Sequence, residues 1–459
     1  MDKNKYRIEK DSMGDVHVPF EALFGAQTQR AIENFTISPQ PLPWNFIRAV
    51  LIIKSAAAKT NMSLGLISEE NGRLICQAID ELLATPRPDQ FPVSVFQTGS
   101  GTSTNMNVNE VIAGLCRKKG KVISPNDHVN CSQSSNDVIP TAIHIAAAIS
   151  TTTTLLPAIK NLATVIRTFG EKNRDVIKTG KTHLMDALPI RLQAEVEGWA
   201  TQFDESEERI SSALPRLLRI PLGGTAVGSG VNCHSSFAKK AITAINYTTE
   251  LNFTQTPSLY KGLSSLDTIV EFSGHLKTIA LALNKVANDL RWMNSGPLSG
   301  LGEIKLPALQ PGSSIMPAKI NPVIPEAVCM AAAQVIGNDT TISIGAMGGN
   351  FQLNTMLPVV ASNILQSIDL LTGSARSLGE KAIAGITVNR EVYDKPLSMN
   401  PILITSLAPI IGYMRAAEIA KTAQKQKKTV LEIALEQTDI PQEELEKLLN
   451  PANLADGGS

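Results

Sequence analysis

The stretch IPTAIHIAAAISTTTTLLPAIKNLATVIRTFGEKN, residues 139–173, decides the fold of this chain. It is rich in alanine, isoleucine and leucine, and its only glycine is Gly170. Apolar residues recur at close to helical spacing, at Ile143, Ala147, Leu155, Ile159 and Leu162. The pattern predicts a long buried helix, because packing over such a length outweighs the poor helix propensity of four consecutive threonines.

Similar helical patterns continue near residues 188–217, 235–252, 264–294 and 355–380, with loops rich in glycine, proline and serine between them. Helices of this length exceed the usual mean of about 11–12 residues, and they predict a bundle whose apolar faces continue into neighbouring subunits. Strand signals are few, and the best is FPVSVFQ at residues 91–97. The predicted fold class is therefore mainly α.

The pattern of predicted helices and loops changes twice along the sequence, and a chain of 459 residues is too long for one ordinary core. We expect a mixed N-terminal domain over residues 1–135 and a central domain of long helices over residues 136–390. Shorter helical patterns predict a small C-terminal helical domain over residues 391–459.

The charge balance argues against partners that need a charged surface. Lys plus Arg equals Asp plus Glu at 42 each, so a net charge of zero predicts no binding to nucleic acid or to an anionic membrane. Charged residues make up only 18%, below the usual quarter, which favours surface buried in an oligomer.

The cysteines and histidines do not suggest a metal site. The five cysteines are odd in number and contain no CxxC pair, so they predict reduced thiols, and the six histidines include no HExxH pair. The N-terminus is polar, without the apolar segment of a secretory signal, and no run of about 18 apolar residues predicts a membrane span. We expect a cytoplasmic protein.

Four loops next to predicted helices are rich in hydrogen-bonding side chains, and the first is QTGSGTSTNMNVNE at residues 97–110. Its glycines allow a ligand to approach the backbone, and Ser100, Thr102 and Asn105 supply neutral donors. The alternative is that a serine or threonine simply caps a helix. No GK[ST] follows, so this is not a phosphate-binding P-loop.

The second loop, SPNDHVNCSQSSNDVIP at residues 124–140, leads into the long predicted helix. Ser134, Ser135 and Asn136 would lie at the start of that helix, where backbone N–H groups and the helix dipole favour anions. Helix capping is again the alternative. We interpret His128 as a structural hydrogen-bonding residue.

The third loop is GKTHLMDALPIRL at residues 180–192. Thr182 and His183 are expected just before a helix that begins near Pro189, and histidine is the side chain that titrates near neutrality.

The fourth loop is GSSIMPAKINP at residues 312–322, and two prolines constrain it. It carries Ser313, Ser314, Lys319 and Asn321, and Glu326 follows. The glycine-rich segment LGGTAVGSG at residues 222–230 lacks the GxGxxG spacing of a dinucleotide site. The four loops together predict a pocket for a small, multiply charged carboxylate, without metal or nucleotide.

In this order, the four loops resemble the active-site regions of the fumarase/aspartase superfamily, and GSSIMPAKINP resembles its signature. The segments RIEKDSMGDVHVP and FGAQTQRAIENF, within residues 7–35, resemble the N-terminus of class II fumarases. The resemblance covers residues 7 to 453. It implies a three-domain fold with a central five-helix bundle, which forms a twenty-helix core in a homotetramer.

The same resemblance implies the chemistry. The family chemistry is reversible anti addition across fumarate or a fumaryl product, without a cofactor, at sites built from three chains. For this chain the resemblance to class II fumarases implies hydration of fumarate to L-malate. It implies that Ser313 is the base that forms an aci-carboxylate, that Lys319 stabilises this intermediate, and that His183 handles the leaving group. Glu326 would tune His183, and Gly312 would be a hinge of a closing loop.

Further positions match the residues that bind substrate in the family: Ser100, Gly101, Thr102, Ser134, Ser135, Asn136, Thr182, Ser314 and Asn321. A candidate secondary dicarboxylate site comprises Ser124, Pro125, Asn126 and Asp127. Ser124 stands where many fumarases have histidine, so this second site is expected to be weakened.

Two other functions stay open on this sequence. An aspartate ammonia-lyase is favoured by INPVIPEAV and GTSTN, whereas QSSND with Ser135, and GAQTQR, are typical of fumarases. A non-catalytic structural homologue is the second alternative, and the presence of Ser313, Lys319 and His183 argues against it.

Overall fold

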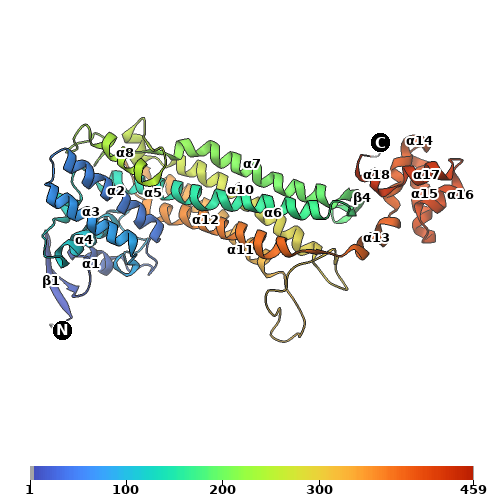
Figure 1. Cartoon of the computed structure of the whole chain (residues 1–459), viewed down its shortest axis with the longest axis horizontal. Helices are drawn as coiled ribbons and strands as arrows, with labels where there is room; N and C mark the ends of the chain where they lie inside the picture. The colour runs from blue at the N-terminus through green and yellow to red at the C-terminus, as the bar shows by residue number, and fades with distance from the viewer. Residues whose placement is uncertain (1–4, 458–459) are drawn as a thin grey trace. The chain divides into compact units, whose positions relative to one another are not determined.

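The computed structural model describes residues 5–457, except for the side chain of Lys395. The chain divides into two compact units. Unit 1 comprises residues 1–157, 208–280 and 333–372, and unit 2 comprises residues 158–207, 281–332 and 373–459. The divisions fall within five helices, which are α6 (Leu156–Lys172), α7 (Leu192–Leu217), α10 (Asp267–Met293), α11 (Val323–Ala346) and α12 (Leu357–Ser377) (Figure 1).

The mainly α prediction is confirmed, and four of the predicted long helical stretches are present as α7, α8 (Phe237–Thr249), α10 and α12. The predicted long buried helix at residues 139–173 is part of a helix from Ser135 to Lys172, which consists of α5 (Ser135–Ser150), a π-helical turn η3 (Thr151–Leu155), and α6. The hydroxyls of Thr152, Thr153 and Thr154 donate back to helix carbonyls, such as Thr153 Oγ1 to Ile149 O at 2.7 Å. This back-bonding explains why the helix widens at the four threonines.

By length and composition alone, the stretch Ser135–Lys172 could also span a membrane. However, 67% of its most apolar window is buried inside the fold, as in a core helix.

The N-terminal part of unit 1 starts with an antiparallel hairpin of β1 (Tyr6–Asp11) and β2 (Gly14–Pro19). Helices α1 (Ala26–Asn34), α2 (Trp44–Ser63), α3 (Glu69–Ala84) and α4 (Thr102–Lys118) follow and lie together (Figure 1). A short 3-10 helix η1 (Pro88–Gln90) and a π-helical turn η2 (Pro125–Val129) complete this part. Helix α2 is buried along most of its length, and it packs against α3, α4, α5 and α8.

A buried carboxylate replaces the missing side-chain cap of α1. Glu110, on α4, accepts hydrogen bonds from the backbone N–H groups of Gly25, Gln27 and Thr28 at 2.9 to 3.0 Å. The first turn of a helix leaves such N–H groups without partners, and a carboxylate satisfies them strongly.

The rest of unit 1 contains short elements. Strands β5 (Arg219–Ile220) and β6 (Thr254–Gln255) pair in parallel, and β8 (Gly349–Asn350) and β9 (Leu353–Asn354) pair antiparallel. Helix α9 (Leu259–Ser264) precedes α10. The predicted strand at residues 91–97 is wrong: the segment makes one isolated bridge, Ser94 to Pro41, and Pro92 removes a backbone donor within it.

Unit 2 contains a hairpin that the sequence patterns missed. Strands β3 (Ile177–Thr182) and β4 (Met185–Arg191) pair antiparallel, and α7 begins at Leu192, not near Pro189 as predicted. The reason is that residues 185–191 find a pairing partner in β3, which local propensity does not reveal. Strands β7 (Ile304–Lys305) and β10 (Thr387–Val388) form a second short antiparallel pair.

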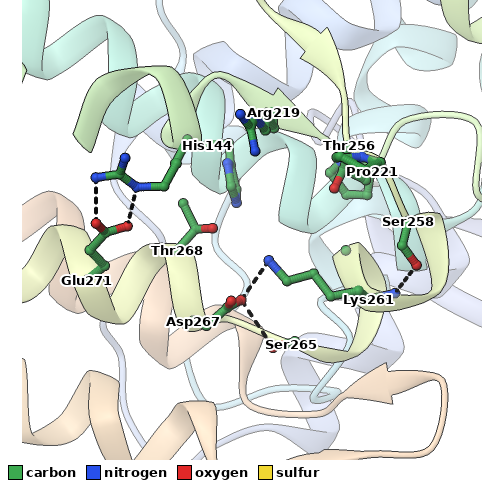
Figure 2. Close-up of a pocket in the computed structure, with 13 residues that line it drawn as sticks. His144, Arg219, Pro221, Thr256, Ser258, Lys261, Ser265, Asp267, Thr268 and Glu271 are labelled. Atoms are coloured by element: carbon green, nitrogen blue, oxygen red, sulfur yellow. Dashed lines mark hydrogen bonds and ion pairs between the residues drawn. The ribbon is translucent and has the colours of Figure 1, made fainter. Parts of the chain in front are cut away.

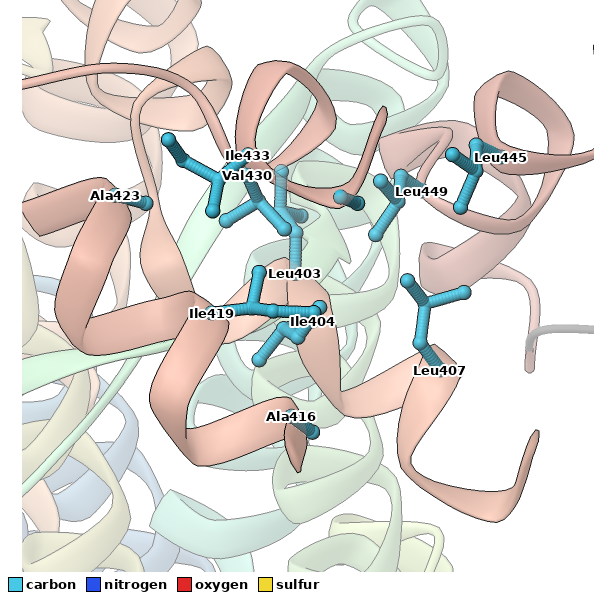
Figure 3. Close-up of a cluster of buried hydrophobic side chains, with 11 residues drawn as sticks. Leu403, Ile404, Leu407, Ala416, Ile419, Ala423, Val430, Ile433, Leu445 and Leu449 are labelled. Carbon is cyan, nitrogen blue, oxygen red and sulfur yellow. The ribbon is translucent and has the colours of Figure 1, made fainter. Parts of the chain in front are cut away.

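The C-terminal part of unit 2 consists of short helices, as predicted. After η4 (Leu378–Ala382) and η5 (Ile383–Gly385) come α13 (Arg390–Ser398), η6 (Pro401–Leu407), α14 (Ala408–Ile411), α15 (Tyr413–Gln426), α16 (Val430–Gln437), α17 (Gln442–Leu448) and α18 (Pro451–Ala455). They enclose a small apolar cluster that includes Leu403, Leu407, Ile419, Ile433 and Leu445 (Figure 3). Thr429 and Glu432 form a capping box that starts α16.

Helix α11 was not among the predicted helices. Its apolar residues are not confined to one face, so it shows little amphipathic periodicity. Several of its apolar side chains are exposed in the single chain, including Met330 at 68% and Ile344 at 59%.

Candidate active site

The first predicted loop enters α4 through a left-handed glycine. Gly101 is the N-cap of α4 at φ 73°, so the N-cap residue has no capping side chain. Gln97 Oε1 instead accepts from Thr104 N at 2.9 Å, so the alternative of a serine or threonine cap is wrong for this loop. The Ser100 and Thr102 hydroxyls lie 2.8 Å apart, and Ser100 is buried. Gly99 is needed for close approach, because a Cβ there would lie 2.0 Å from the carbonyl oxygen of Thr355.

The second loop ends at the N-terminus of α5. Ser134 caps this helix: its Oγ accepts from Asn136 N at 3.2 Å, and its own N–H donates to Asp137 Oδ1 at 2.9 Å. Ser134 is therefore a capping residue in the single chain, as the alternative stated. Ser135 is 9% exposed, and the Asn136 amide donates to Ala226 O at 2.7 Å.

Asp137 ties the α5 N-terminus to the glycine-rich segment 222–230. Its Oδ2 accepts from Gly223 N at 2.9 Å and from Thr225 N at 3.0 Å. The carboxyl is fully buried, and this burial raises its pKa even though the N–H groups of Ser134, Thr225 and Gly223 act to lower it. The segment therefore anchors the start of α5.

The first two loops meet in the structure. A Cβ on Gly101 would lie 2.9 Å from the Ile139 side chain on α5. Asn105, on α4, donates from Nδ2 to Ser135 Oγ at 3.0 Å and to Asn130 Oδ1 at 3.1 Å. The predicted binding residues Ser100, Gly101, Thr102, Ser134, Ser135 and Asn136 thus gather where α4 and α5 begin.

Next to these residues a set of amide side chains surrounds a buried lysine. We call it the amide network: Lys54, Asn105 and Asn109, which are buried, and Asn130 and Gln133, which are half-buried. Sequence reasoning noted Asn105 but missed Lys54. The available signal was a single lysine inside the apolar run AVLIIKSAAA of α2.

The candidate secondary site folds back on itself. The Ser124 hydroxyl donates to Asp127 Oδ2 at 2.7 Å and accepts from Asp127 N at 3.0 Å, and Ser124 N donates to His128 Nδ1 at 3.0 Å. These bonds form the turn η2, and Asn126 and Asp127 are exposed. His128 has the structural role that we predicted for it.

In unit 2, Thr182 and His183 lie at the tip of the β3–β4 hairpin. Thr182 pairs with Met185, so His183 and Leu184 form a two-residue turn with φ of 54° and 60°. Such left-handed values suit type I′ turns but are uncommon for residues other than Gly, and least so for Asn, Asp and His. Thr182 and His183 are exposed in the single chain.

A buried ion cluster supports this hairpin. Lys178, on β3, donates to Glu303 at 2.7 Å and to Glu195 at 2.9 Å, and Lys181 also bonds to Glu303. Burial acts to lower the pKa of Lys178, but the charges of Glu195 and Glu303 raise it overall. The strand before Thr182 is therefore anchored by charge as well as by pairing.

The fourth loop, residues 312–322, is called the serine loop below. It closes on itself through Gly312 N to Lys319 O at 2.8 Å and Asn321 Nδ2 to Gly312 O at 2.6 Å. A Cβ on Gly312 would lie 2.2 Å from Lys319 O, so close approach explains this glycine. The hinge role of Gly312 stays a prediction.

Ser313 and Lys319 make only local contacts. Ser313 Oγ accepts from Ile315 N at 3.2 Å and from Met316 N at 3.0 Å, and Lys319 Nζ donates to Asn321 Oδ1 at 2.5 Å. Ser314 and Lys319 are exposed. The side chains of Lys319 and Asn321, with Glu326 in the first turn of α11, line a cavity of about 1200 Å³ within unit 2.

The expected hydrogen bond between His183 and Glu326 does not form within the described part of this single chain, so that pairing stays a prediction. In residues 5–457, no three His, Cys, Asp or Glu side chains gather in a way that could hold a metal ion.

A second cavity, of about 360 Å³, lies in unit 1 and contains none of the predicted site residues (Figure 2). Its charged groups largely pair with one another: Arg216 bonds to Glu271 at 2.5 Å, and Lys261 bonds to Asp267 at 2.8 Å. His144 is buried at its edge with Nδ1 2.7 Å from Leu217 O, and burial lowers its pKa to about 4. The charged side chains that line this cavity thus mostly neutralise one another.

Comparison with known proteins gives consistent results along the chain. Residues 14–337 match the Lyase family, and residues 403–456 match the family Fumarase C C-terminus. "Fumarate hydratase class II 2" of Pseudomonas aeruginosa is 52% identical over 98% of this chain and 99% of its own length. "Fumarate hydratase class II" of Mycobacterium tuberculosis is 47% identical over 95% of this chain and 92% of its own.

Two solved structures are also similar. The recombinant class II fumarase of Schistosoma mansoni has a TM-score of 0.95 at 35% identity, over 98% of this chain and 99% of that one. The fumarate lyase:delta crystallin of Brucella melitensis has a TM-score of 0.93 at 40% identity, over the same shares of the two chains.

Proposed function

The chain belongs to the lyase family, among the class II fumarate hydratases, and from this premise we propose that it catalyses the reversible hydration of fumarate to L-malate. The observation that carries this function is the 52% identity to a fumarate hydratase over 98% of the chain. The enzyme is a carbon–oxygen lyase that adds and removes water.

In the direction from malate, Ser313 Oγ removes a proton from the carbon next to one carboxylate. The electron pair moves into that carboxylate and forms an aci-carboxylate, and the C–O bond on the neighbouring carbon then breaks. A serine is a weak base unless its alkoxide is stabilised. The N–H groups of Ile315 and Met316, already directed at Oγ at 3.2 and 3.0 Å, supply that stabilisation.

Lys319 and Asn321 hold the negative charge that develops on the aci-carboxylate. A fixed cation and an amide donor aimed at developing charge are the strongest electrostatic aid that a site of this kind offers. Their support in the structure is the contact between Lys319 Nζ and Asn321 Oδ1 at 2.5 Å, which sets both groups on one side of the serine loop.

His183 gives a proton to the leaving hydroxide, and Glu326 orients His183 through a charge-assisted hydrogen bond. The exposed turn at φ 54° for His183 supports this role, because strained backbone positions concentrate at functional sites. The serine loop closes over the substrate and excludes water during the reaction.

The hydroxyl and amide groups at the starts of α4 and α5 bind the substrate carboxylates, together with Thr182 and Ser314. The N-terminus of α5 adds its partial positive charge. Thus the binding residues are Ser100, Gly101, Thr102, Ser134, Ser135, Asn136, Thr182, Ser314 and Asn321, and the reaction uses no cofactor.

We also propose that the enzyme is a homotetramer with a twenty-helix core, in which each active site takes loops from three chains. The exposed apolar side chains on α11, such as Met330 and Ile344, support burial against other copies. Light scattering should give the mass of four chains, and a monomer at micromolar concentration would contradict the proposal.

Mixing chains tests whether the sites are shared. Ser313→Ala and His183→Asn tetramers, each inactive alone, should regain part of the wild-type activity after subunit exchange, because some sites then receive one intact loop from each parent. Mass spectrometry verifies that subunits have exchanged. If activity does not recover in the exchanged tetramers, the sites are not shared.

One assay tests the reaction itself. The purified protein is given L-malate or L-aspartate, without metal or nucleotide, and fumarate is followed by its ultraviolet absorbance. Signal from malate alone is the expected result. Signal from aspartate alone would identify an ammonia-lyase, and silence in both from a folded oligomer would favour a non-catalytic homologue.

We propose a cytoplasmic location, supported by five free cysteines, which suit a reducing compartment. Fractionation of the source cells would overturn this location if activity appeared only in a membrane or exported fraction.

A further inference from the structure

Lys54, on α2, is a buried cation without a carboxylate partner. Its side chain is 0% exposed, and no salt bridge within residues 5–457 includes it. Its Nζ donates to two neutral amide oxygens, Asn130 Oδ1 at 3.0 Å and Gln133 Oε1 at 3.1 Å. Lysine is rarely buried completely, and taking an ammonium out of water costs several kcal/mol unless other groups compensate. A purely structural side chain at this position would not need a charge.

The ammonium determines which way the neighbouring amides point. It has three N–H donors and no acceptor, so Asn130 must present its oxygen to Lys54. The same oxygen also accepts from Asn105 Nδ2 at 3.1 Å and from Asn109 Nδ2 at 3.2 Å. Both of these amides therefore present their NH₂ groups, and the oxygens at their other ends, Asn105 Oδ1 and Asn109 Oδ1, are left buried without a partner.

The same hydrogen-bond network includes the hydroxyl of Ser135, a predicted substrate-binding residue. Asn105 Nδ2 also donates to Ser135 Oγ at 3.0 Å. Because Ser135 Oγ accepts there, its own proton is available to another acceptor. The second amide that accepts from Lys54 is also fixed in orientation. Gln133 Nε2 donates to Val129 O at 3.1 Å and to Cys131 O at 3.0 Å, and these bonds hold the loop before α5.

We propose that Lys54 is a positioning residue for the dicarboxylate substrate: its charged form orients the amide network so that Ser135 donates to a substrate carboxylate, and binding of the dianion favours that charged form. The inference rests on the proposed function, because it takes Ser135 as a substrate-binding residue. It adds a buried cation that none of the four loops contains.

Burial lowers the pKa of Lys54 to about 7, and the charge of Asp137 opposes this shift. Five elements pack against α2: α3, α4, α5, α8 and η2. Among the titratable groups on these elements, the charge of Asp137 acts on Lys54. Cys76 and Lys240 contact Ser55 and Ser63 of α2, Glu110 binds the start of α1, and Asp127 and His128 bond within η2.

The charge of Lys54 sets the sign of the pH dependence. Below pH 7 Lys54 is charged and the network has the orientation that serves binding. Above pH 7 free enzyme loses the proton, so a bound dianion must draw one back. KM for L-malate should therefore be lowest near pH 6 and rise towards pH 8, and binding at pH 7.5 should take up on the order of half a proton.

The test uses the full-length enzyme and three readouts. Lys54→Met keeps the side-chain length and removes charge and donors. Its KM for malate at pH 6 should rise by about tenfold or more, with a smaller change in kcat, and this KM should no longer depend on pH through 7. Calorimetry with succinate, in two buffers of different ionisation enthalpy, should show proton uptake for the wild type and none for Lys54→Met. His128→Asn, which removes another basic side chain of this region, should keep the uptake.

A double mutant separates positioning from general stability. If Lys54 acts through Ser135, then Lys54→Met/Ser135→Ala should have a KM close to that of Ser135→Ala alone. Independent, additive losses would overturn the proposal. If Lys54→Met does not fold, the wild-type calorimetry decides: absence of proton uptake at pH 7.5 overturns the proposal.

The two hypotheses fail differently. A wild-type enzyme that neither converts malate nor binds succinate contradicts the proposed function. A wild-type enzyme that converts malate, while Lys54→Met keeps the same KM and pH profile, contradicts only the role of Lys54.

Discussion

The start of α5 and the serine loop both carry predicted site residues, but they are built in opposite ways. Around α5, Ser135 is 9% exposed, Asp137 is 0% exposed, and their hydrogen bonds reach residues 30 to 88 positions away. In the serine loop, the side chains of Ser313, Lys319 and Asn321 bond only to groups within residues 312–321. Long-range hydrogen bonds fix the start of α5, whereas local hydrogen bonds alone fix the side chains of the serine loop.

The difference suggests a division of labour. Hydrogen bonds to buried, distant partners fix the groups that bind the carboxylates before substrate arrives, which reduces the entropy lost on binding. A loop with few outside contacts can open and close, which the base and the charge-stabilising lysine need in order to exclude water. We therefore expect changes at α5 to reduce stability or affinity, and changes in the serine loop to reduce turnover.

The largest effect should come from Asp137→Ala. This substitution leaves the N–H groups of Ser134, Gly223 and Thr225 without their acceptor, and we expect a loss of about 3 kcal/mol or more in the free energy of unfolding. Thermal unfolding should show a clearly lower Tm. Glu69→Ala, which removes an exposed carboxylate paired with Arg73, is the matched control and should cost a few tenths of a kcal/mol. Equal Tm values for the two variants would mean that the buried hydrogen bonds at the start of α5 do not contribute more to stability than an exposed ion pair does.

Ser313→Ala should cut kcat by at least ~100-fold, the scale of losing a positioned base, while Tm and the oligomeric state stay unchanged. The measurement is fumarate formation from L-malate, with size-exclusion chromatography of the same sample. Ser314→Ala is the neighbouring control and should change KM more than kcat. Near-normal turnover of Ser313→Ala would falsify its assignment as the base.

Ser135→Ala should raise KM for malate about tenfold and lower kcat less, because the lost hydrogen bond is made in the ground state as well as in the transition state. Steady-state kinetics at pH 7 would measure this. A fall in kcat with unchanged KM would mean that Ser135 acts in the chemical step and not in substrate binding, so the two regions would not differ in role as proposed.

The smallest effect should come from Asp127→Asn, in the candidate secondary site. Ser124 and Asp127 bond to each other in an exposed turn, and the histidine expected for that site is missing, so kcat/KM should stay within about twofold of the wild-type value. A tenfold loss would mean that this turn supports the α5 region after all.

The sequence predicted much of this molecule correctly. The long helices α7, α8, α10 and α12 and the short C-terminal helices follow from apolar periodicity. Periodicity did not reveal α11, because its apolar residues are not confined to one face. Propensity did not reveal the β3–β4 hairpin, whose turn at His183 and Leu184 contains none of the usual turn residues.

For the candidate site, the sequence by itself determined the chemistry available, because the identities of Ser313, Lys319, His183 and Ser135 are local facts. Only the tertiary structure decided which polar groups are buried. Lys54 and Asp137 are separated by more than eighty positions, and nothing near either residue predicts that α2, α4 and α5 would enclose both. Burial, and with it the strength of a charge and the direction of a hydrogen bond, depends on remote segments packing together, which no local pattern contains.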